Sequence, residues 1–433
     1  MDQFVQLEVL VIDHIRCNIL NMINKNSKKI LICDFGATLN YTHHFQFIKS
    51  NIMFINRNYK NVVIGVILPV ASELNSNNFK PAHFTKKLLW PIYFFPHTKI
   101  TLFSTWFTFI WRKFGQWICT FNPSLYLNIS VFLILPYFIF CRANLIIFPT
   151  ACAQSFKLIE LLDIFHVKKS FHVHFSNTSE IRFPYGSIKN CENFIKRSNK
   201  FKFIDIVLSF DTSILFDFYS KLNVNNNFYL ARPPSTHNTE SLPLKLSSTT
   251  KSKIIKILIM GRPTDPGRDS LIIKSLQEFS VINRNFNLHK GVSFEFGVIF
   301  EDPSRIALTY NSFKNSFQIK KLYSKMNFLE LVDLLITATI VVLPYNPSIY
   351  SKNHSGMIML LSDLKIPIVT CDDAAFSPEV LEFKLGKLFD YELSFASALT
   401  EALSNFNDSR FNEYFQIREQ ENRKLFERFN IGF

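Results

Sequence analysis

A polar loop lies between an apolar strand and an apolar helix in "VVLPYNPSIYSKNHSGMIMLLSDLKIPIVT", residues 341–370. Ser355 and Gly356 stand where the helix begins, and a glycine there lets the backbone come close to a ligand. The first amides of a helix, together with its dipole, form a site for an anion such as a diphosphate. The segment therefore predicts an anion site, and its loop supplies the candidate binding side chains Tyr345, Tyr350, Lys352 and His354.

A second loop, "MGRPTDPGRD" at 260–269, follows another apolar strand. It contains Gly261, and its Arg262 and Arg268 could neutralise the same diphosphate through fork-like hydrogen bonds. The alternative is a solvated pair of arginines with a local aspartate as partner. Binding residues commonly lie on loops that follow strands, which favours the functional interpretation.

Two further histidines, His172 and His174, alternate along one apolar segment and would share a strand face. Two imidazoles on one face could suggest a metal site. No third ligand is apparent, so a structural role or a place in a ligand cleft is favoured, and no metal site is predicted. The sequence also lacks a Ser-His-Asp motif, a P-loop and a complete GxGxxG.

These side chains need a framework, and alternating apolar runs predict one. Short β-branched runs separated by helical periodicity indicate parallel strands that are buried on both faces. A stretch rich in Pro, Ser and Thr then separates two series of such runs. The fold class is predicted as α/β with two doubly wound, Rossmann-like domains. The predicted division is a first domain at 1–235, a linker at 236–253, a second domain at 254–405 and an amphipathic terminal helix within 406–433.

The composition is that of a folded protein with large cores. The chain has 433 residues, of which 48% are hydrophobic and 19% charged. Its seven cysteines show no CxxC spacing, which fits reduced thiols. The N-terminus is acidic and lacks the basic start of a signal peptide, so a cytoplasmic protein is predicted.

Positive charge is concentrated in residues 74–159. This segment has eight Lys and Arg residues, no Asp or Glu, and all four tryptophans of the chain. Aromatic residues among cations are attracted to the headgroups of an anionic membrane, which predicts peripheral contact with its inner face. A Phe-rich core with a basic surface is the alternative. Nucleic acid is not predicted as a partner, because no nucleic-acid-binding motif accompanies the charge.

The most apolar stretch, "LYLNISVFLILPYFIFC" at 125–141, has the minimum length for a membrane span. It contains Asn128, Ser130 and a central Pro136, and a strand-like run follows it directly. A core helix that leads into a strand is therefore the favoured interpretation.

The two domains, the linker and the terminal helix resemble the GT-B fold of glycosyltransferases, and the second half resembles the group 1 (family 4) retaining enzymes. "LPYNPSIYSKNHSGMIMLLSDLKIPIV" is similar to that family's Pro-Tyr-Asp-Pro, Tyr, Ser-Gly and Pro-Val-Val pattern. "MGRPTDPGRD" stands at the place of its Gly-Arg loop, and "THHFQF" at 42–47 resembles the start of its first helix. The likeness extends over most of the chain and is specific only in 341–370.

The resemblance implies a metal-independent, retaining hexosyltransferase. The second domain would bind a nucleotide-diphosphate sugar, and the first domain a glycan or lipid-linked acceptor. Such chemistry is used in the synthesis of cell-surface polysaccharides or glycolipids. His44 would lie near the transferred sugar, although its ring could equally well belong to the core. Lys352 and Leu360 occupy the places of the family's two glutamates. The alternative function is therefore a catalytically degenerate GT-B protein that acts as a binding or assembly partner.

Overall fold

The computed structural model describes eighteen parts of the chain, and the account below is restricted to them. They are residues 28–34, 43–59, 62–68, 83–87, 131–132, 134–136, 138–175, 188–222, 227–235, 254–261, 265–286, 293–299, 313, 317–322, 326, 328–351, 355–404 and 410–429.

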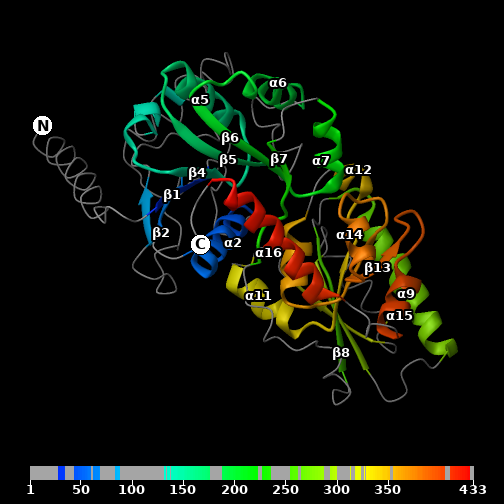
Figure 1. Cartoon of the computed structure of the whole chain (residues 1–433). Helices are drawn as coiled ribbons and strands as arrows, with labels where there is room; N and C mark the ends of the chain where they lie inside the picture. Colours follow the sequence, from blue (N-terminus) through cyan, green and yellow to red (C-terminus); the bar gives the residue numbers. More distant parts are fainter. Residues whose placement is uncertain are drawn as a thin grey trace, which may run out of the picture.

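Two separate parallel sheets organise these residues (Figure 1). The first sheet has the strand order β3-β2-β1-β4-β5-β6-β7, and every described strand pair in it is parallel. Its strands are β1 Lys28–Cys33, β2 Val62–Leu68, β3 His83–Lys87, β4 Leu145–Phe148, β5 Lys169–Phe175, β6 Ile204–Phe210 and β7 Phe228–Leu230. The helices that accompany it are α2 His43–Asn58, α5 Ala153–Ile164, α6 Ile188–Ser198 and α7 Ser213–Ser220.

Alternation along the central strands gives the first sheet a core on each face. Leu31 of β1 and Ile146 of β4 belong to one hydrophobic cluster, whereas Ile30 and Ile147 belong to another. Successive side chains of a strand point to opposite faces, so an uninterrupted apolar run is buried on both sides only when helices cover both faces. Helices α5 and α6 cover one face and α2 covers the other, as the residues of the two clusters show.

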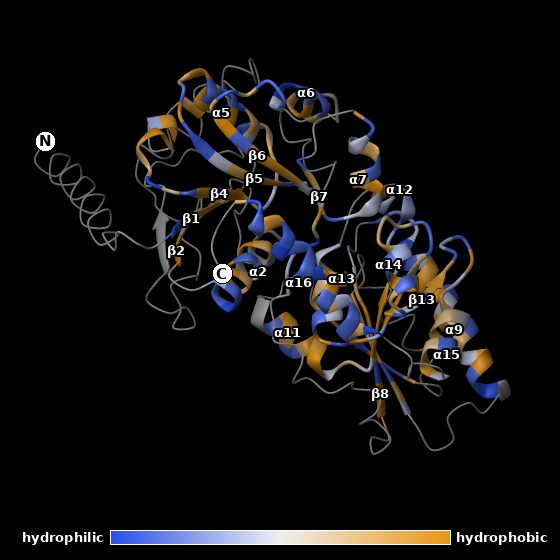
Figure 2. Cartoon of the chain, viewed as in Figure 1, coloured by the Kyte–Doolittle hydropathy of each residue, from blue (hydrophilic) through white to orange (hydrophobic). Residues whose placement is uncertain are grey.

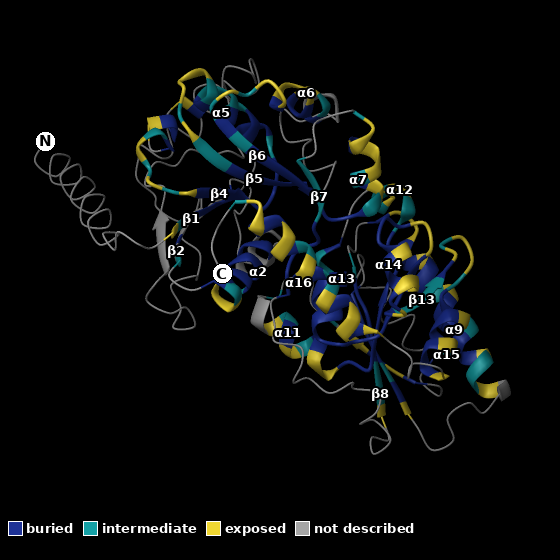
Figure 3. Cartoon of the chain, viewed as in Figure 1, coloured by how far each residue is buried: buried dark blue, intermediate teal, exposed yellow. Residues whose placement is uncertain are grey.

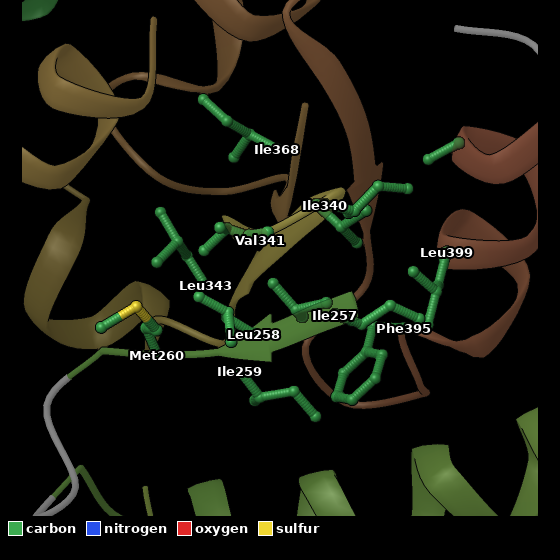
Figure 4. Close-up of a cluster of buried hydrophobic side chains, with 14 of the residues drawn as sticks. Ile257, Leu258, Ile259, Met260, Ile340, Val341, Leu343, Ile368, Phe395 and Leu399 are labelled. Carbon is green, nitrogen blue, oxygen red and sulfur yellow. The ribbon is translucent and has the colours of Figure 1, made fainter. Parts of the chain in front are cut away.

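The second sheet has the order β10-β9-β8-β11-β12-β13, again with parallel pairs throughout its described strands. Its strands are β8 Ile254–Ile259, β9 Ser293–Val298, β10 Gln318–Lys321, β11 Ile340–Leu343, β12 Ile368–Cys371 and β13 Gly386–Phe389. Its helices are α9 Arg268–Phe286, α11 Phe328–Thr337, α12 Pro347–Tyr350, α13 Gly356–Asp363, α14 Ser377–Glu382 and α15 Ala396–Ser404. Figure 4 shows part of the core that these elements share, and Figure 3 shows burial concentrated in both sheets.

The terminal helix α16, Phe411–Glu427, contacts both halves of the molecule (Figure 1, red). Phe411 and Tyr414 near its start belong to the core of the second sheet. Leu425 and Phe426 near its end belong to a core of the first sheet. The structure confirms the predicted α/β class, the two doubly wound sheets and the amphipathic terminal helix, and it gives that helix two cores to dock on.

Within the stretch 125–141, the described positions 131–132, 134–136 and 138–140 are helical, and the described Cys141 follows the helix. Val131, Ile134, Leu135 and Phe138 are buried in the first domain. In the described part of the chain, no helix combines the length and the apolar character that a membrane crossing requires. The favoured prediction of a core helix is thus correct for one face of this helix.

Candidate functional site

The crossover pattern of the second sheet places a topological switch point between β8 and β11. These two strands are neighbours, and the chain continues from β8 to β9 on one side and from β11 to β12 on the other. Loops that leave two such strands at their carboxyl ends diverge, and the space between them is where doubly wound proteins bind ligands. The two loops are the ones that the sequence singled out, at 260–269 and 344–356.

Gly261 is in close contact with the neighbouring loop. Its φ of +113° lies in the region that favours glycine, and a Cβ at this position would lie 3.2 Å from Cε1 of Tyr345. The backbone before it is held by a hydrogen bond from Met260 N to Val342 O of β11, at 2.9 Å. A larger residue at 261 would have to displace Tyr345.

Tyr345 in turn organises the start of α13. Its ring stacks on Tyr350 with centroids 4.1 Å apart, and its hydroxyl is 2.8 Å from Ser355 Oγ. Ser355 is the N-cap of α13 and its Oγ accepts a hydrogen bond from Met357 N. Burial raises the pKa of Tyr345, so it stays a neutral hydrogen-bonding group. The tyrosine pair and the cap together fix the helix end that was predicted to face an anion.

Two residues that were not among the predicted site residues hold the loop before α9. Asn346 Nδ2 donates to Pro266 O at 3.3 Å, and Tyr391 Oη donates to the same oxygen at 3.1 Å. Tyr391 follows β13, so it lies at the same carboxyl edge of the sheet as the two loops. That position was the available signal, because carboxyl ends of parallel strands share one edge.

Arg268 is fully buried at the start of α9. Its guanidinium donates to Ile299 O at 2.6 Å and to Met260 O at 3.4 Å, and it lies 3.4 Å from Asp269. Burial lowers its pKa, against the effect of Asp269 and Asp265. Arg268 therefore supports the ends of β8 and β9 in this structure, and contact with a diphosphate stays a prediction. Arg262, Lys352 and His354 lie outside the described residues, so their predicted roles also stay predictions.

The helix α13 carries no described carboxylate that is available for a ribose. Leu360 is buried and lines a pocket with Phe47 of α2 and Pro233, which follows β7. Asp363, the next carboxylate along the helix, accepts a hydrogen bond from Arg418 Nη1 of α16 at 2.7 Å, and both side chains are buried. The face of α13 that a nucleotide could have used is occupied by contacts between the domains.

The two strand histidines are linked through a serine rather than a metal. His172 Nε2 and His174 Nδ1 lie 2.7 Å and 2.8 Å from Ser209 Oγ of β6. His174 pairs with Ser209 across the sheet, so knowledge of the strand register would have found it. Both imidazoles line a small pocket at the domain junction with Pro233 and Asn422. Burial lowers the pKa of His172 to about 3, so its ring is neutral.

His44 lies in α2, and its side chain is outside the described part. The same helix brings Phe47 and Asn51 to the two junction pockets, so its N-terminal half faces the space between the domains. The described residues contain no group of three His, Cys, Asp or Glu side chains that could hold a metal ion. The five described cysteines are free.

No family model matches the sequence, and no curated protein does. Solved structures do match along nearly the whole chain. A sucrose-phosphate synthase from Thermosynechococcus elongatus aligns with a TM-score of 0.53 and 12% identity over 91% of this chain and 94% of that one. The trehalose-6-phosphate synthase OtsA aligns with a TM-score of 0.52 and 9% identity over 93% and 99%. A UDP-N-acetylglucosamine 2-epimerase aligns with a TM-score of 0.51 and 10% identity over 93% and 95%.

The chain has the GT-B fold. This is the fold that the sequence resemblance implied. At identities of 9% to 12%, the similarity to these structures shows the fold alone. In this GT-B chain, the switch point between β8 and β11 lies in the second domain. The histidine pocket adjoins the pocket between the domains, because the two share Phe47, Pro233 and Pro234.

Proposed function

We propose that the protein is a glycosyltransferase that uses a nucleotide-diphosphate sugar. The observation that carries this proposal is the close approach of Gly261 to Tyr345 beside the Ser355 cap of α13, at the topological switch point of the second sheet. Backbone that comes this close to a capped helix start suits a diphosphate, because main-chain amides and the helix dipole bind it without a metal. The names of two aligned proteins, the sucrose-phosphate and trehalose-6-phosphate synthases, support a sugar-transfer reaction on this fold.

The proposed reaction divides between the domains. The second domain binds the donor diphosphate, and the first domain presents a glycan or a lipid-linked acceptor across the junction. Breaking the sugar–phosphate bond places charge on the leaving diphosphate, and groups arranged in advance around it lower the barrier. Arg262 and Lys352, on the two loops, are the proposed cations, and Arg268 holds the loop backbone. Transfer with retention of configuration, use of a hexose and a place in polysaccharide or glycolipid synthesis remain parts of this proposal.

Thermal unfolding with nucleoside diphosphates tests donor binding. A ligand that binds only the native state raises its stability, so UDP, GDP or ADP should raise the melting temperature. Ser355→Ala should diminish that shift, because it removes the cap at the proposed diphosphate site. Thr212→Ala is the matched control, since it removes the N-cap of α7 in the other domain. No shift with any of the three diphosphates would overturn the proposal.

A second function, a degenerate GT-B protein that binds without turnover, is favoured by a separate observation. Leu360 packs at the domain junction and Asp363 is tied to Arg418, so α13 offers a nucleotide ribose no described carboxylate. Loss of this carboxylate removes two hydrogen-bond acceptors from the donor site.

Turnover separates the two functions. Wild-type protein, Arg262→Ala and Lys352→Ala would be incubated with a panel of nucleotide sugars, and released diphosphate would be measured by mass spectrometry. The enzyme proposal expects release by the wild type and at least about a hundredfold less by each variant, as for loss of a group that stabilises transition-state charge. Nucleotide binding with equal, negligible release by all three proteins supports the degenerate protein.

A further inference from the structure

The edge of the first sheet that faces away from the domain junction combines exposed aromatic residues with cations. It is the edge where the parallel strands begin, whereas the histidine pocket lies toward the edge where they end. In Figures 2 and 3 the outer side of this domain, near α5, carries hydrophobic and exposed positions. Exposed aromatic side chains cost free energy in water, so a cluster of them indicates a surface that binds something.

Exposed phenylalanines form the apolar part of this edge and of the helix that leads to it. Phe132 and Phe140 are 65% and 80% exposed, on the helix whose opposite face is buried in the core. They are eight residues apart, so they lie on one side of that helix with the exposed Pro136 between them. Phe165, which is 53% exposed, follows α5 directly and stands beside the exposed Ile164.

Backbone and side-chain contacts join the segments that carry these residues. Lys169 Nζ donates to Cys141 O, which connects the end of the first helix with the start of β5. Asp163 accepts hydrogen bonds from the amides of Lys202 and Phe203, and the ring of His166 lies 4.4 Å from that of Phe203. Residues 140–142, 163–169 and 200–203 are therefore one continuous edge.

The charge of this edge is positive. Arg142, Lys168, Lys200 and Lys202 are exposed on it. The described carboxylates nearby are already engaged: Asp163 by the two amides, and Glu160 by Arg197 at 3.1 Å. Asp205 lies 3.5 Å from Arg428. Exposed aromatic rings surrounded by cations are complementary to the headgroup region of an anionic bilayer.

We infer that this edge, formed by Phe140, Phe165, Arg142, Lys168, Lys200 and Lys202, docks the protein reversibly on an anionic membrane surface. Charge complementarity selects the bilayer, because the cations would attract its lipids while the rings enter the headgroup layer. The surface differs from the one that the sequence predicted: the four tryptophans of 74–159 lie outside the described residues, and three of the four cations named here lie beyond that segment.

This geometry has a consequence for orientation. β5 has seven residues, so the junction lies about 20 Å from the docked edge. Docking would hold the protein at the membrane with the domain junction above the headgroups, where a long or water-exposed acceptor can reach it. The inference does not depend on the proposed function, since it rests on none of the donor-site residues.

The test is co-sedimentation of the full chain with vesicles of phosphatidylcholine alone and of phosphatidylcholine mixed with phosphatidylglycerol. Wild-type protein should pellet only with the mixed vesicles, and less so as salt is added. Lys168→Glu with Lys202→Glu should weaken the partitioning at least about tenfold, because each cation near the surface contributes about fivefold. Phe140→Ser with Phe165→Ser should weaken it at least about tenfold through lost apolar area.

Matched controls lie in the second domain, where Lys274 and Lys384 are exposed and Leu381 and Leu393 are 59% and 61% exposed. Lys274→Glu with Lys384→Glu, and Leu381→Ser with Leu393→Ser, should bind like the wild type. Melting temperatures of all variants verify folding. The inference is overturned if wild-type protein does not pellet with mixed vesicles, or if patch and control variants bind equally. It is also overturned if the phenylalanine variant instead dissociates a dimer in light scattering, or if RNA rather than vesicles binds with the same dependence on these residues.

Discussion

Gly261 is the residue at which backbone conformation and side-chain packing coincide. Its φ of +113° is rarely adopted by other residues, and the Tyr345 ring leaves almost no room for a Cβ. Gly267, in the same loop, has a φ of +77° and open space around it. The two positions separate the cost of conformation from the cost of contact.

We expect Gly261→Ala to lower the free energy of unfolding by about 2–3 kcal/mol, through strain and the displaced tyrosine. Gly267→Ala should cost only about 1 kcal/mol, from conformation alone. Urea unfolding of both variants measures the difference. Equal losses would mean that the contact with Tyr345 has no energetic weight.

His172 makes the stability dependent on pH. Its folded-state pKa is about 3, below the unfolded value of about 6.5, because burial disfavours the charged ring. The stability that neutral His172 contributes is therefore fully present above pH 6.5 and is lost as the pH falls toward 3. At pH 5.5 the loss should be about 1.4 kcal/mol.

Urea unfolding at a series of pH values checks this prediction. His172→Gln should reduce the slope of stability against pH below 6.5 by about one proton. His166→Asn is the control, since His166 is exposed and asparagine tolerates its φ of +57°. A slope that is unchanged in His172→Gln would show that the ring is not buried in its neutral form.

At the scale of elements, α16 is held to α13 by a buried ion pair. Arg418 Nη1 donates to Asp363 at 2.7 Å, and Arg418 Nε donates to Pro233 O at 2.9 Å. Removing one partner of a buried pair leaves the other charge without compensation, which costs far more than the pair itself contributes.

We therefore expect Arg418→Met to lower the free energy of unfolding by about 3–5 kcal/mol, and Arg418→Met with Asp363→Leu to recover most of the loss. The Lys320 side chain is 60% exposed and forms an ion pair with Glu295. Lys320→Met removes this pair and should lower the free energy of unfolding by only about 0–1 kcal/mol. Chemical unfolding of the four proteins gives the values. A double variant no better than Arg418→Met would argue against an uncompensated Asp363.

The position of a strand in its sheet largely decides whether the sequence predicts it. Apolar runs at 28–37, 144–150, 204–210 and 338–345 predict strands, and these correspond to β1, β4, β6 and β11. All four are central and carry continuous apolar runs, because both of their faces are buried. The run at 386–391 also predicts a strand, the edge strand β13. The strands that were not predicted, β3, β7 and β10, are all edge strands. Their sequences HFTKK, FYL and QIKK are short or polar, as edge strands tend to be, and they carry no distinctive pattern.

The candidate site divides in the same way. Gly261, Ser355 and Tyr345 could be singled out from the sequence, because glycine, a cap residue and a strand end each leave a local signal. The burial of Arg268 left no such signal, since the partners Met260 O and Ile299 O are backbone atoms brought together by the sheet. Asp363 was also not predictable as a partner of Arg418, because the two are 55 residues apart in the sequence.

For the whole molecule, the two cores share one helix. Phe411 and Tyr414 pack in the second domain, and Leu425 and Phe426 pack in the first. Arg232 adds a link, because it bonds Glu379 of α14 at 2.8 Å and Glu421 of α16. A helix that is buried at both ends couples the unfolding of one domain to that of the other.

Two probes can follow the domains separately, because all four tryptophans belong to the first half of the sequence. In the wild type, tryptophan fluorescence and far-ultraviolet circular dichroism should report the same urea midpoint, as for a single cooperative transition. Leu425→Ala with Phe426→Ala removes buried volume from the first domain only, at a cost of about 5 kcal/mol or more. The fluorescence midpoint should then fall well below that of circular dichroism, since the end of α16 no longer transmits the stability of the second domain.

Phe411→Ala, at the other end of the helix, is the control. It should not lower the fluorescence midpoint below the circular dichroism midpoint. Coincident midpoints in the Leu425 and Phe426 variant would mean that the domains are coupled by contacts other than α16, and the buried pair of Arg232 with Glu379 would be the next to remove.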